Sequence, residues 1–150
     1  MPQSLAKNYI HLVFSTQDRR PFLTHGTRTD LFAYVTNLLK NMDCAVFQIG
    51  GVEDHIHILF SLDKNIALSK LVNDLKTNSS KWLKSKSDNL IEFAWQHGYG
   101  AFSVSQSDIE SVKEYIQNQP KPHEKMSFQD ELRALLNRYE IGFDERYLWG

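Results

Sequence analysis

A run of alternating residues, Asp54–Ile58, constrains the fold of this chain more than any other feature. Its two histidines, His55 and His57, are separated by one apolar residue. Side chains alternate between the two faces of a β-strand, so both imidazoles would lie on one face, with Ile56 and Ile58 on the other. The run therefore predicts a strand with one apolar face toward a core and two imidazoles together on the opposite face. Two neighbouring imidazoles are half of a divalent-metal site.

Periodic patterns along the chain predict the element order β-α-β-β-α-β-α-α. A capping box of Ser107 and Glu110 marks the start of the third helix. The order fits an α+β fold, in which a ferredoxin-like split β-α-β arrangement forms one antiparallel sheet with appended C-terminal helices. We expect a single domain over residues 1–150. The expected strands are 9–15, 44–50, 55–62, 93–95 and 101–105, and the expected helices are 26–42, 67–86, 107–119 and 127–139.

Charge is distributed unevenly along the chain. The net charge is only −1, which does not by itself indicate a nucleic-acid-binding protein. Residues 1–87 carry 11 basic and 7 acidic side chains (+4), whereas residues 88–150 carry 6 and 11 (−5). Between Lys64 and Lys86 there are six lysines and one acid, Asp74. Such a stripe is suited to binding phosphates, although a solvated helix face explains the charge equally well.

Other features of the composition bear on location. No apolar run approaches the roughly 20 residues of a membrane helix. The first four residues lack the charged and apolar regions of a secretory signal. The single cysteine, Cys44, excludes an intramolecular disulfide and a cysteine-rich zinc site. We therefore expect a cytoplasmic protein that does not associate with membranes.

Two histidines would leave a metal with positions for further ligands. The candidates are Gln119, His97, His123 and nearby acidic residues. Two imidazoles and an amide oxygen, with positions left open for phosphate, suit Mg²⁺ or Mn²⁺ better than a closed zinc site would. Tyr115 lies four residues before Gln119, on the same side of the predicted helix. It is a candidate nucleophile, and the alternative is a tyrosine that borders the core.

These motifs together resemble a known family. His55-Ile56-His57 is similar to the HUH signature (histidine, hydrophobic, histidine), and the segment 115–119 is similar to the single-tyrosine helix motif of HUH enzymes. The resemblance is to the small single-tyrosine transposases of bacterial insertion sequences and the REP-associated tyrosine transposases. One departure is that His123 is followed by Glu124, where family members often carry paired histidines. Further similar segments are Ser15-Thr16, Arg19-Arg20, Gly50-Gly51, Leu75–Ser80, Trp95–Tyr99 and Phe128–Leu132.

The resemblance implies an HUH endonuclease fold and a mechanism. His55, His57 and Gln119 would hold Mg²⁺ or Mn²⁺, and Tyr115 would attack a phosphodiester to leave a 5′-phosphotyrosine and a free 3′-OH. The substrate would be single-stranded DNA folded into hairpins, and a homodimer with exchanged tyrosine helices is expected. Exposed aromatic side chains such as Tyr99 and Phe102 would stack on bases. The residues expected to contact DNA are Lys76, Lys81, Lys84, Arg19 and Arg20.

Two alternatives remain close to this interpretation. A replication-initiator or relaxase-type HUH nicking enzyme shares the histidine pair, but it is usually larger and has a different tyrosine motif. A domesticated module would bind hairpin DNA without cutting it, although all four key residues are present here. A nucleotide hydrolase of the HIT type would need a third alternating histidine, and position 59 is a leucine.

Overall fold

The computed structural model describes residues 3–120 and 126–150, and its centre is one four-stranded antiparallel sheet. The strand order is β2-β3-β1-β4. Strand β3 separates β1 from β2, and β1 separates β3 from β4, so two split β-α-β units interleave. This is the predicted ferredoxin-like arrangement, and the α+β fold is confirmed. The strands are β1 (Tyr9–Ser15), β2 (Ala45–Gly51), β3 (His55–Ser61) and β4 (Gly100–Val104).

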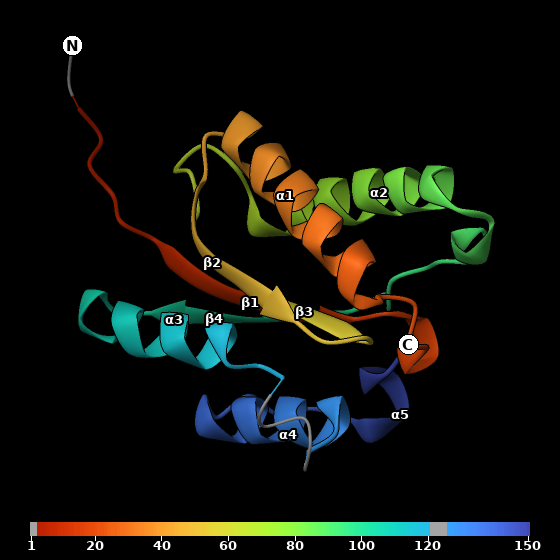
Figure 1. The fold of residues 1–150 in the computed structure, drawn as a ribbon. Helices are drawn as coiled ribbons and strands as arrows, with labels where there is room; N and C mark the ends of the chain where they lie inside the picture. The colour runs from red at the N-terminus through yellow and green to blue at the C-terminus, as the bar shows by residue number, and fades with distance from the viewer. Residues whose placement is uncertain (1–2, 121–125) are drawn as a thin grey trace.

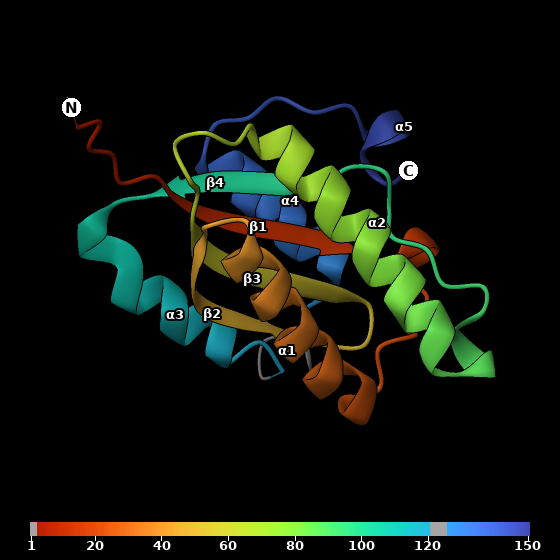
Figure 2. The same ribbon diagram turned by 90° about the horizontal axis from the view of Figure 1, so that it is seen from above.

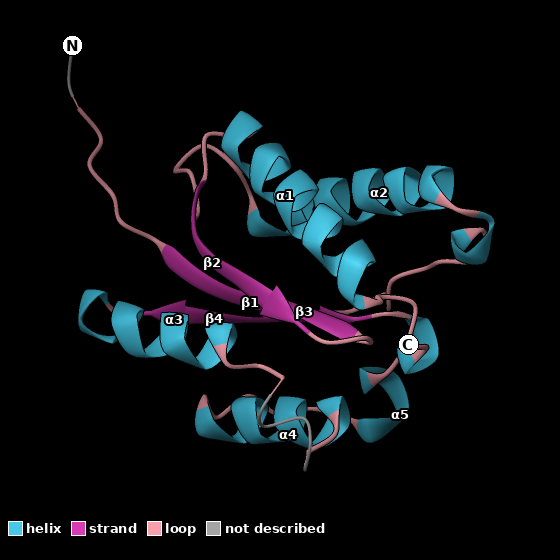
Figure 3. Ribbon diagram, in the orientation of Figure 1, coloured by secondary structure: helices cyan, strands magenta, loops and turns pink. Residues whose placement is uncertain are grey.

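Helices cover both faces of the sheet, as Figures 1 and 2 show. On one face lie α1 (His25–Asn41) and α2 (Leu68–Lys86). On the other lie α3 (Ile109–Gln117) and α4 (Phe128–Arg138), and the short α5 (Glu145–Leu148) follows α4. In Figure 3 the strands are magenta and the helices cyan, which sets the sheet apart from the helices on its two faces. The described residues also form three short 3-10 helices, which are η1 (Gln17–Arg19), η2 (Asp88–Leu90) and η3 (Gln106–Asp108). None of the described helices is both long and apolar enough to cross a membrane.

Strand β3 divides the interior into two layers, as its alternation predicted. Ile56, Ile58 and Phe60 are fully buried in the main core beneath α1 and α2. That core forms because the apolar residues of α1 and α2 recur at helical spacing and face the sheet. His55 and His57 point to the opposite layer, which α3 and α4 cover. The antiparallel register fixes this choice, because a slip by one residue would exchange the two faces.

Three local expectations differ from the structure. Residues 93–95 form no named strand, and Trp95 makes only an isolated bridge with Thr16. The capping box does not form, because the Ser107 hydroxyl meets the hydroxyl of Ser105 and the η3 turn comes before α3. Helix α3 ends at Gln117, so Gln119 lies in the following turn, where its backbone N–H bonds to the carbonyl of Ile116. Tyr115 and Gln119 still reach the same side.

Gly50 allows α3 to lie directly against β2. A Cβ at this position would collide with the carbonyl oxygen of Ile116 and would also press on the Ile116 side chain. Both obstacles belong to the last turn of α3, and backbone atoms do not move aside cheaply. The glycine therefore sets how closely the end of this helix, with Tyr115 and Gln119, approaches the sheet.

We expect Gly50→Ala to destabilise the fold by about 1–3 kcal/mol, because it overpacks the contact between β2 and α3. Urea denaturation followed by circular dichroism measures the change. Gly26→Ala is the matched control, because an added Cβ there has no neighbour within 4 Å and α1 favours alanine. Equal stability of Gly50→Ala and the unsubstituted protein would contradict the close approach of α3.

Candidate active site

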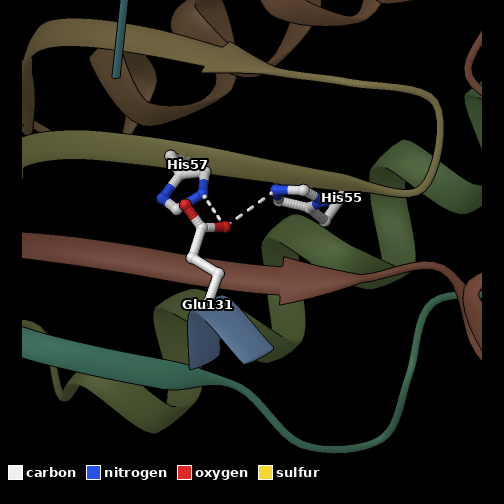
Figure 4. Close-up of side chains that lie close together, drawn as sticks. All are labelled: His55, His57 and Glu131. Carbon is white, nitrogen blue, oxygen red and sulfur yellow. Dashed lines mark hydrogen bonds and ion pairs between the residues drawn. The ribbon is translucent and has the colours of Figure 1, made fainter. Parts of the chain in front are cut away.

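The two histidines of β3 meet a carboxylate from α4. His55 and His57 are fully buried, and the Nε2 atom of each lies 3.1 Å from Oε1 of Glu131. Figure 4 shows this carboxylate facing both rings. Glu131 itself is only 2% exposed. Among the described residues, these three form a group whose ligand atoms all lie within 4.8 Å of one another.

Gln119 joins the same cluster from the turn after α3. Its Oε1 lies 3.2 Å from Nε2 of His55, and its Nε2 donates to Oε2 of Glu131 at 2.9 Å. Its side chain is fully buried. The predicted third ligand is therefore placed beside the histidine pair, and Glu131 adds an oxygen that the sequence had not assigned.

The donor set fits a divalent cation. Two ligand atoms on one cation at about 2.1 Å lie roughly 3.0–3.4 Å apart, depending on the coordination geometry. The observed separations of 3.1 and 3.2 Å fall within this interval. Two imidazole nitrogens with amide and carboxylate oxygens are ligands that Mn²⁺ and Mg²⁺ accept.

Electrostatics around His55 favour a positive charge at this point. Burial lowers the pKa of His55, but hydrogen bonds to Asp54 and Glu131 outweigh it and raise the pKa to about 9. Asp54 Oδ1 lies 2.7 Å from Nδ1 of this ring. Because a ligating imidazole must give up its proton at the ligating nitrogen, a cation bound to Nε2 would take the place of that proton.

Tyr115 extends from α3 into the same cluster. Its hydroxyl donates a hydrogen bond to Oε2 of Glu131, and its ring lies edge-on to His57. Burial, followed by the negative charge of Glu131, raises the pKa of Tyr115 well above its usual value. The phenol is therefore protonated at neutral pH, and a positive charge placed nearby would make it a better nucleophile.

The structure adds His11, which the sequence analysis did not single out. Its Nε2 lies 2.8 Å from Nδ1 of His57, and its side chain is 3% exposed. Burial, together with the proximity of His57, lowers the pKa of His11 to about 3, so this ring is neutral. Two sequence patterns could have indicated His11 and Glu131. His11 belongs to the alternating residues of β1, and Glu131 lies in the apolar stripe of α4 with Phe128 and Leu132.

The candidate ligand His97 lies outside the cluster. His97 is exposed, and its backbone N–H bonds to the carbonyl of Gly150. His123 lies outside the described residues. Of the aromatic side chains expected to stack on DNA, Tyr99 is 39% exposed, but Phe102 is buried and packs against His11 and Tyr139. Phe102 was therefore wrongly expected to be available for stacking.

The lysines expected to contact DNA lie on α2, across the sheet from the histidines. Lys81 and Lys84 are exposed. Lys76 is engaged differently, because its ammonium donates to the carbonyls of residues 96, 97 and 98 at 2.8, 3.2 and 2.6 Å. Burial lowers the pKa of Lys76 to about 8. The structure thus holds Lys76 against the loop before β4 and does not bring these lysines to Tyr115.

The two arginines expected to contact DNA follow β1. The Arg19 guanidinium lies 5.7 Å from the ring centre of Trp149. Arg20 pairs with Glu92 at 3.2 Å, and this ion pair is exposed. Neither arginine belongs to the cluster around Glu131.

Solved structures share this fold. A candidate transposase from Deinococcus radiodurans R1 matches with a TM-score of 0.62 and 20% identity, over 79% of this chain and 98% of that one. A REP-associated tyrosine transposase bound to a REP hairpin matches with a TM-score of 0.61 and 14% identity, over 82% and 73%. No curated protein matches the chain. The family described as "Transposase IS200 like" matches residues 4–119, and the chain therefore belongs to the IS200-like transposases.

Proposed function

We propose that this protein cleaves and rejoins single-stranded DNA through a covalent bond to Tyr115, with the help of a divalent cation. One observation carries the proposal: the hydroxyl of Tyr115 and the Nε2 atoms of His55 and His57 all meet the carboxylate of Glu131. A nucleophile and a set of metal ligands thus share one buried centre. Membership of the IS200-like transposases supports the choice of DNA as substrate.

The cation would be held by His55, His57, Gln119 and Glu131. When bound, Mg²⁺ or Mn²⁺ would polarise the scissile phosphate and neutralise part of the charge that develops on it. The chain's own residues orient the donors: Asp54 holds the ring of His55, and Glu131 accepts a hydrogen bond from the amide of Gln119. Second partners of this kind fix the direction of each ligand atom.

Tyr115 would act as the nucleophile. Its phenolic oxygen forms a bond to phosphorus while the bond from phosphorus to the 3′-oxygen breaks, which leaves a 5′-phosphotyrosine and a 3′-OH. Glu131 already accepts the hydrogen bond of the phenol, so its carboxylate is placed to receive the proton. Attack by another 3′-OH reverses the step and rejoins DNA. The covalent intermediate preserves the energy of the phosphodiester, so ATP is not needed.

A cavity of about 440 Å³ between α3 and α4 provides access to this centre. Its lining includes Tyr115, Glu131, His11 and Arg138. Because His55 and His57 are fully buried, a phosphate would reach the tyrosine from this side. Arg138 would add a positive charge to the approach.

The expected substrate is single-stranded DNA that carries a hairpin. The REP-associated relative of similar fold was solved with a REP hairpin, which supports this class. Arg19, Arg20, Lys76, Lys81 and Lys84 remain the proposed contacts to its backbone. A homodimer with exchanged tyrosine helices and a cytoplasmic location also stay predictions. Here α3 reaches the histidines of its own chain, so one copy contains the nucleophile and its proposed metal ligands.

Tyr115→Phe should abolish the covalent adduct with DNA, because it removes only the attacking oxygen and keeps the ring. A labelled hairpin substrate, Mn²⁺ and a denaturing gel measure the adduct, and mass spectrometry locates it. Tyr139→Phe is the matched control. Tyr139 lines the same cavity, and among the described residues its hydroxyl forms no hydrogen bond with Glu131. An adduct on another tyrosine would overturn the assignment, and cleavage without an adduct would overturn the mechanism.

Glu131→Gln should weaken Mn²⁺ binding by at least about tenfold, because an amide replaces a charged oxygen at nearly constant shape. Isothermal titration calorimetry of the purified protein measures this affinity. Asp130→Asn removes the same charge from the neighbouring exposed position and should leave Mn²⁺ affinity unchanged. If Glu131→Gln binds Mn²⁺ as tightly as the unsubstituted protein, the metal ligands are the histidines and Gln119 without Glu131.

The exposed lysines of α2 give a separate expectation. Changing Lys81 and Lys84 together to alanine should weaken binding of hairpin DNA and flatten its salt dependence, because each lost phosphate contact releases fewer counterions. Fluorescence anisotropy over a salt series gives the slope of log affinity against log salt. Lys40→Ala changes an exposed lysine on α1 and serves as the control. An unchanged slope in the double variant would make these lysines a solvated face.

A further inference from the structure

The geometry points to His11 as the positioning residue of His57: its imidazole bonds to Nδ1 of His57 in either tautomer, and so allows the proton to leave Nε2 when a cation binds there. The inference rests on the proposed function, because it assumes that a divalent cation binds Nε2 of His57. His11 acts only through His57. It is not itself expected to touch cation or substrate.

Both nitrogens of His57 have partners on opposite sides of its ring. Nε2 lies 3.1 Å from Oε1 of Glu131, and Nδ1 lies 2.8 Å from Nε2 of His11. Strand β1 pairs with β3 beside this point, with Val13 opposite His57, so His11 lies two residues along on the same face. The two rings stack with their centres 5.0 Å apart. Because both side chains are buried, water does not compete for this hydrogen bond.

The contact between His11 and His57 uses the nitrogen that the cation would not use. His11 Nε2 lies 2.8 Å from Nδ1 of His57, a hydrogen-bond distance, whereas the proposed ligand atom of His57 is Nε2. His11 moreover meets the edge of His57 that faces away from Glu131. Its role is therefore to orient a ligand.

The two ligand histidines have partners of different chemistry. His55 Nδ1 meets Asp54, whose ionised carboxylate only accepts, so the proton stays on Nδ1 of His55. His57 Nδ1 meets an imidazole, which accepts in one tautomer and donates in the other. His11 can therefore form a hydrogen bond with either neutral tautomer of His57.

This property matches the two states of the site. Without a cation, His57 donates from Nε2 to Glu131, and its Nδ1 accepts a hydrogen bond from Nε2–H of His11. With a cation at Nε2, the His57 proton is on Nδ1 and donates to Nε2 of His11, whose own proton is then on Nδ1. Each ring keeps one proton throughout, so both rings change tautomer and neither imidazole becomes charged.

Three variants test the role of His11 in metal binding. His11→Leu removes donor and acceptor, whereas His11→Gln keeps an amide that offers both at a similar reach. Phe102→Leu loosens the packing against the His11 ring, 6.0 Å away, and leaves the hydrogen bond intact. We expect His11→Leu to weaken Mn²⁺ binding about 10–100-fold in calorimetry. His11→Gln and Phe102→Leu should remain close to the unsubstituted protein.

A spectroscopic measurement supplies a second readout that needs no substitution. In protein labelled with ¹⁵N-histidine, addition of diamagnetic Mg²⁺ should move the His57 proton from Nε2 to Nδ1, and the His11 proton should move in the same sense. A residue that only fills space would not show this paired change. This measurement tests the role of His11 even if His11→Leu fails to fold.

The outcomes separate this inference from the proposed function. If the unsubstituted protein binds Mn²⁺ and His11→Leu binds it equally well, the role of His11 is overturned and the metal site stands. The same holds if folded His11→Gln binds as weakly as His11→Leu, or if Nδ1 of His57 stays unprotonated with Mg²⁺ bound. If the unsubstituted protein binds no Mn²⁺, the proposed metal site fails, and this inference fails with it.

Discussion

A single buried carboxylate joins the elements that form the candidate site of this protein. Glu131 is 2% exposed, and an ionised carboxylate cannot remain in such a place without partners. His55, His57, Gln119 and Tyr115 supply them, from β3 and from α3 with its following turn. Removing one partner of a buried ion pair typically costs about 3–5 kcal/mol. The position of α4 over the sheet and the geometry of the candidate site are therefore consequences of the same contacts.

The alternation of β3 explains why one sheet can support both a core and a site. The apolar face of the strand packs under α1 and α2, and this layer carries most of the large buried side chains. The histidine face also packs apolar residues, in the clusters that contain Leu59 and Phe128, and the polar cluster around Glu131 lies on this same face. Helix α3 ends at Gln117 and its last turn lies close against β2 at Gly50, which brings Tyr115 and Gln119 to that face. The main core and the candidate site thus lie on opposite sides of a single strand.

The sequence predicted most of the fold because the patterns are local. Alternation and helical spacing identified the four main strands and the helices α1 to α4, and the order of elements led to the sheet. The misplaced features depend on weak or competing local signals. Ser107 had another hydroxyl within reach at Ser105, and Trp95 is drawn inward to contact Ser79 and Phe14. The local structure at these two positions is determined by tertiary contacts.

The candidate site was predicted only in part, for a different reason. His55, His57, Tyr115 and Gln119 belong to short motifs, and the structure brings them together. His11 belongs to no motif, and Glu131 lies in the similar segment Phe128–Leu132, to which no ligand role had been assigned. They lie 46 and 74 positions from His57, and only the pairing of β1 and the packing of α4 bring them to it. A charged residue in an apolar stripe, as at Glu131, is the signal that could have been used, because such a position demands a buried partner.

The contacts that stabilise the site without a cation would oppose the proposed attack by Tyr115. Glu131 and burial keep the phenol of Tyr115 protonated, and the hydrogen bonds to Asp54 and Glu131 favour a proton on His55. In the proposed function a cation would reverse both effects, because it would replace the proton at His55 and would lower the cost of negative charge on the tyrosine oxygen. The proposed nucleophile would therefore stay weak until a cation had replaced the proton at His55 and placed positive charge near the phenol.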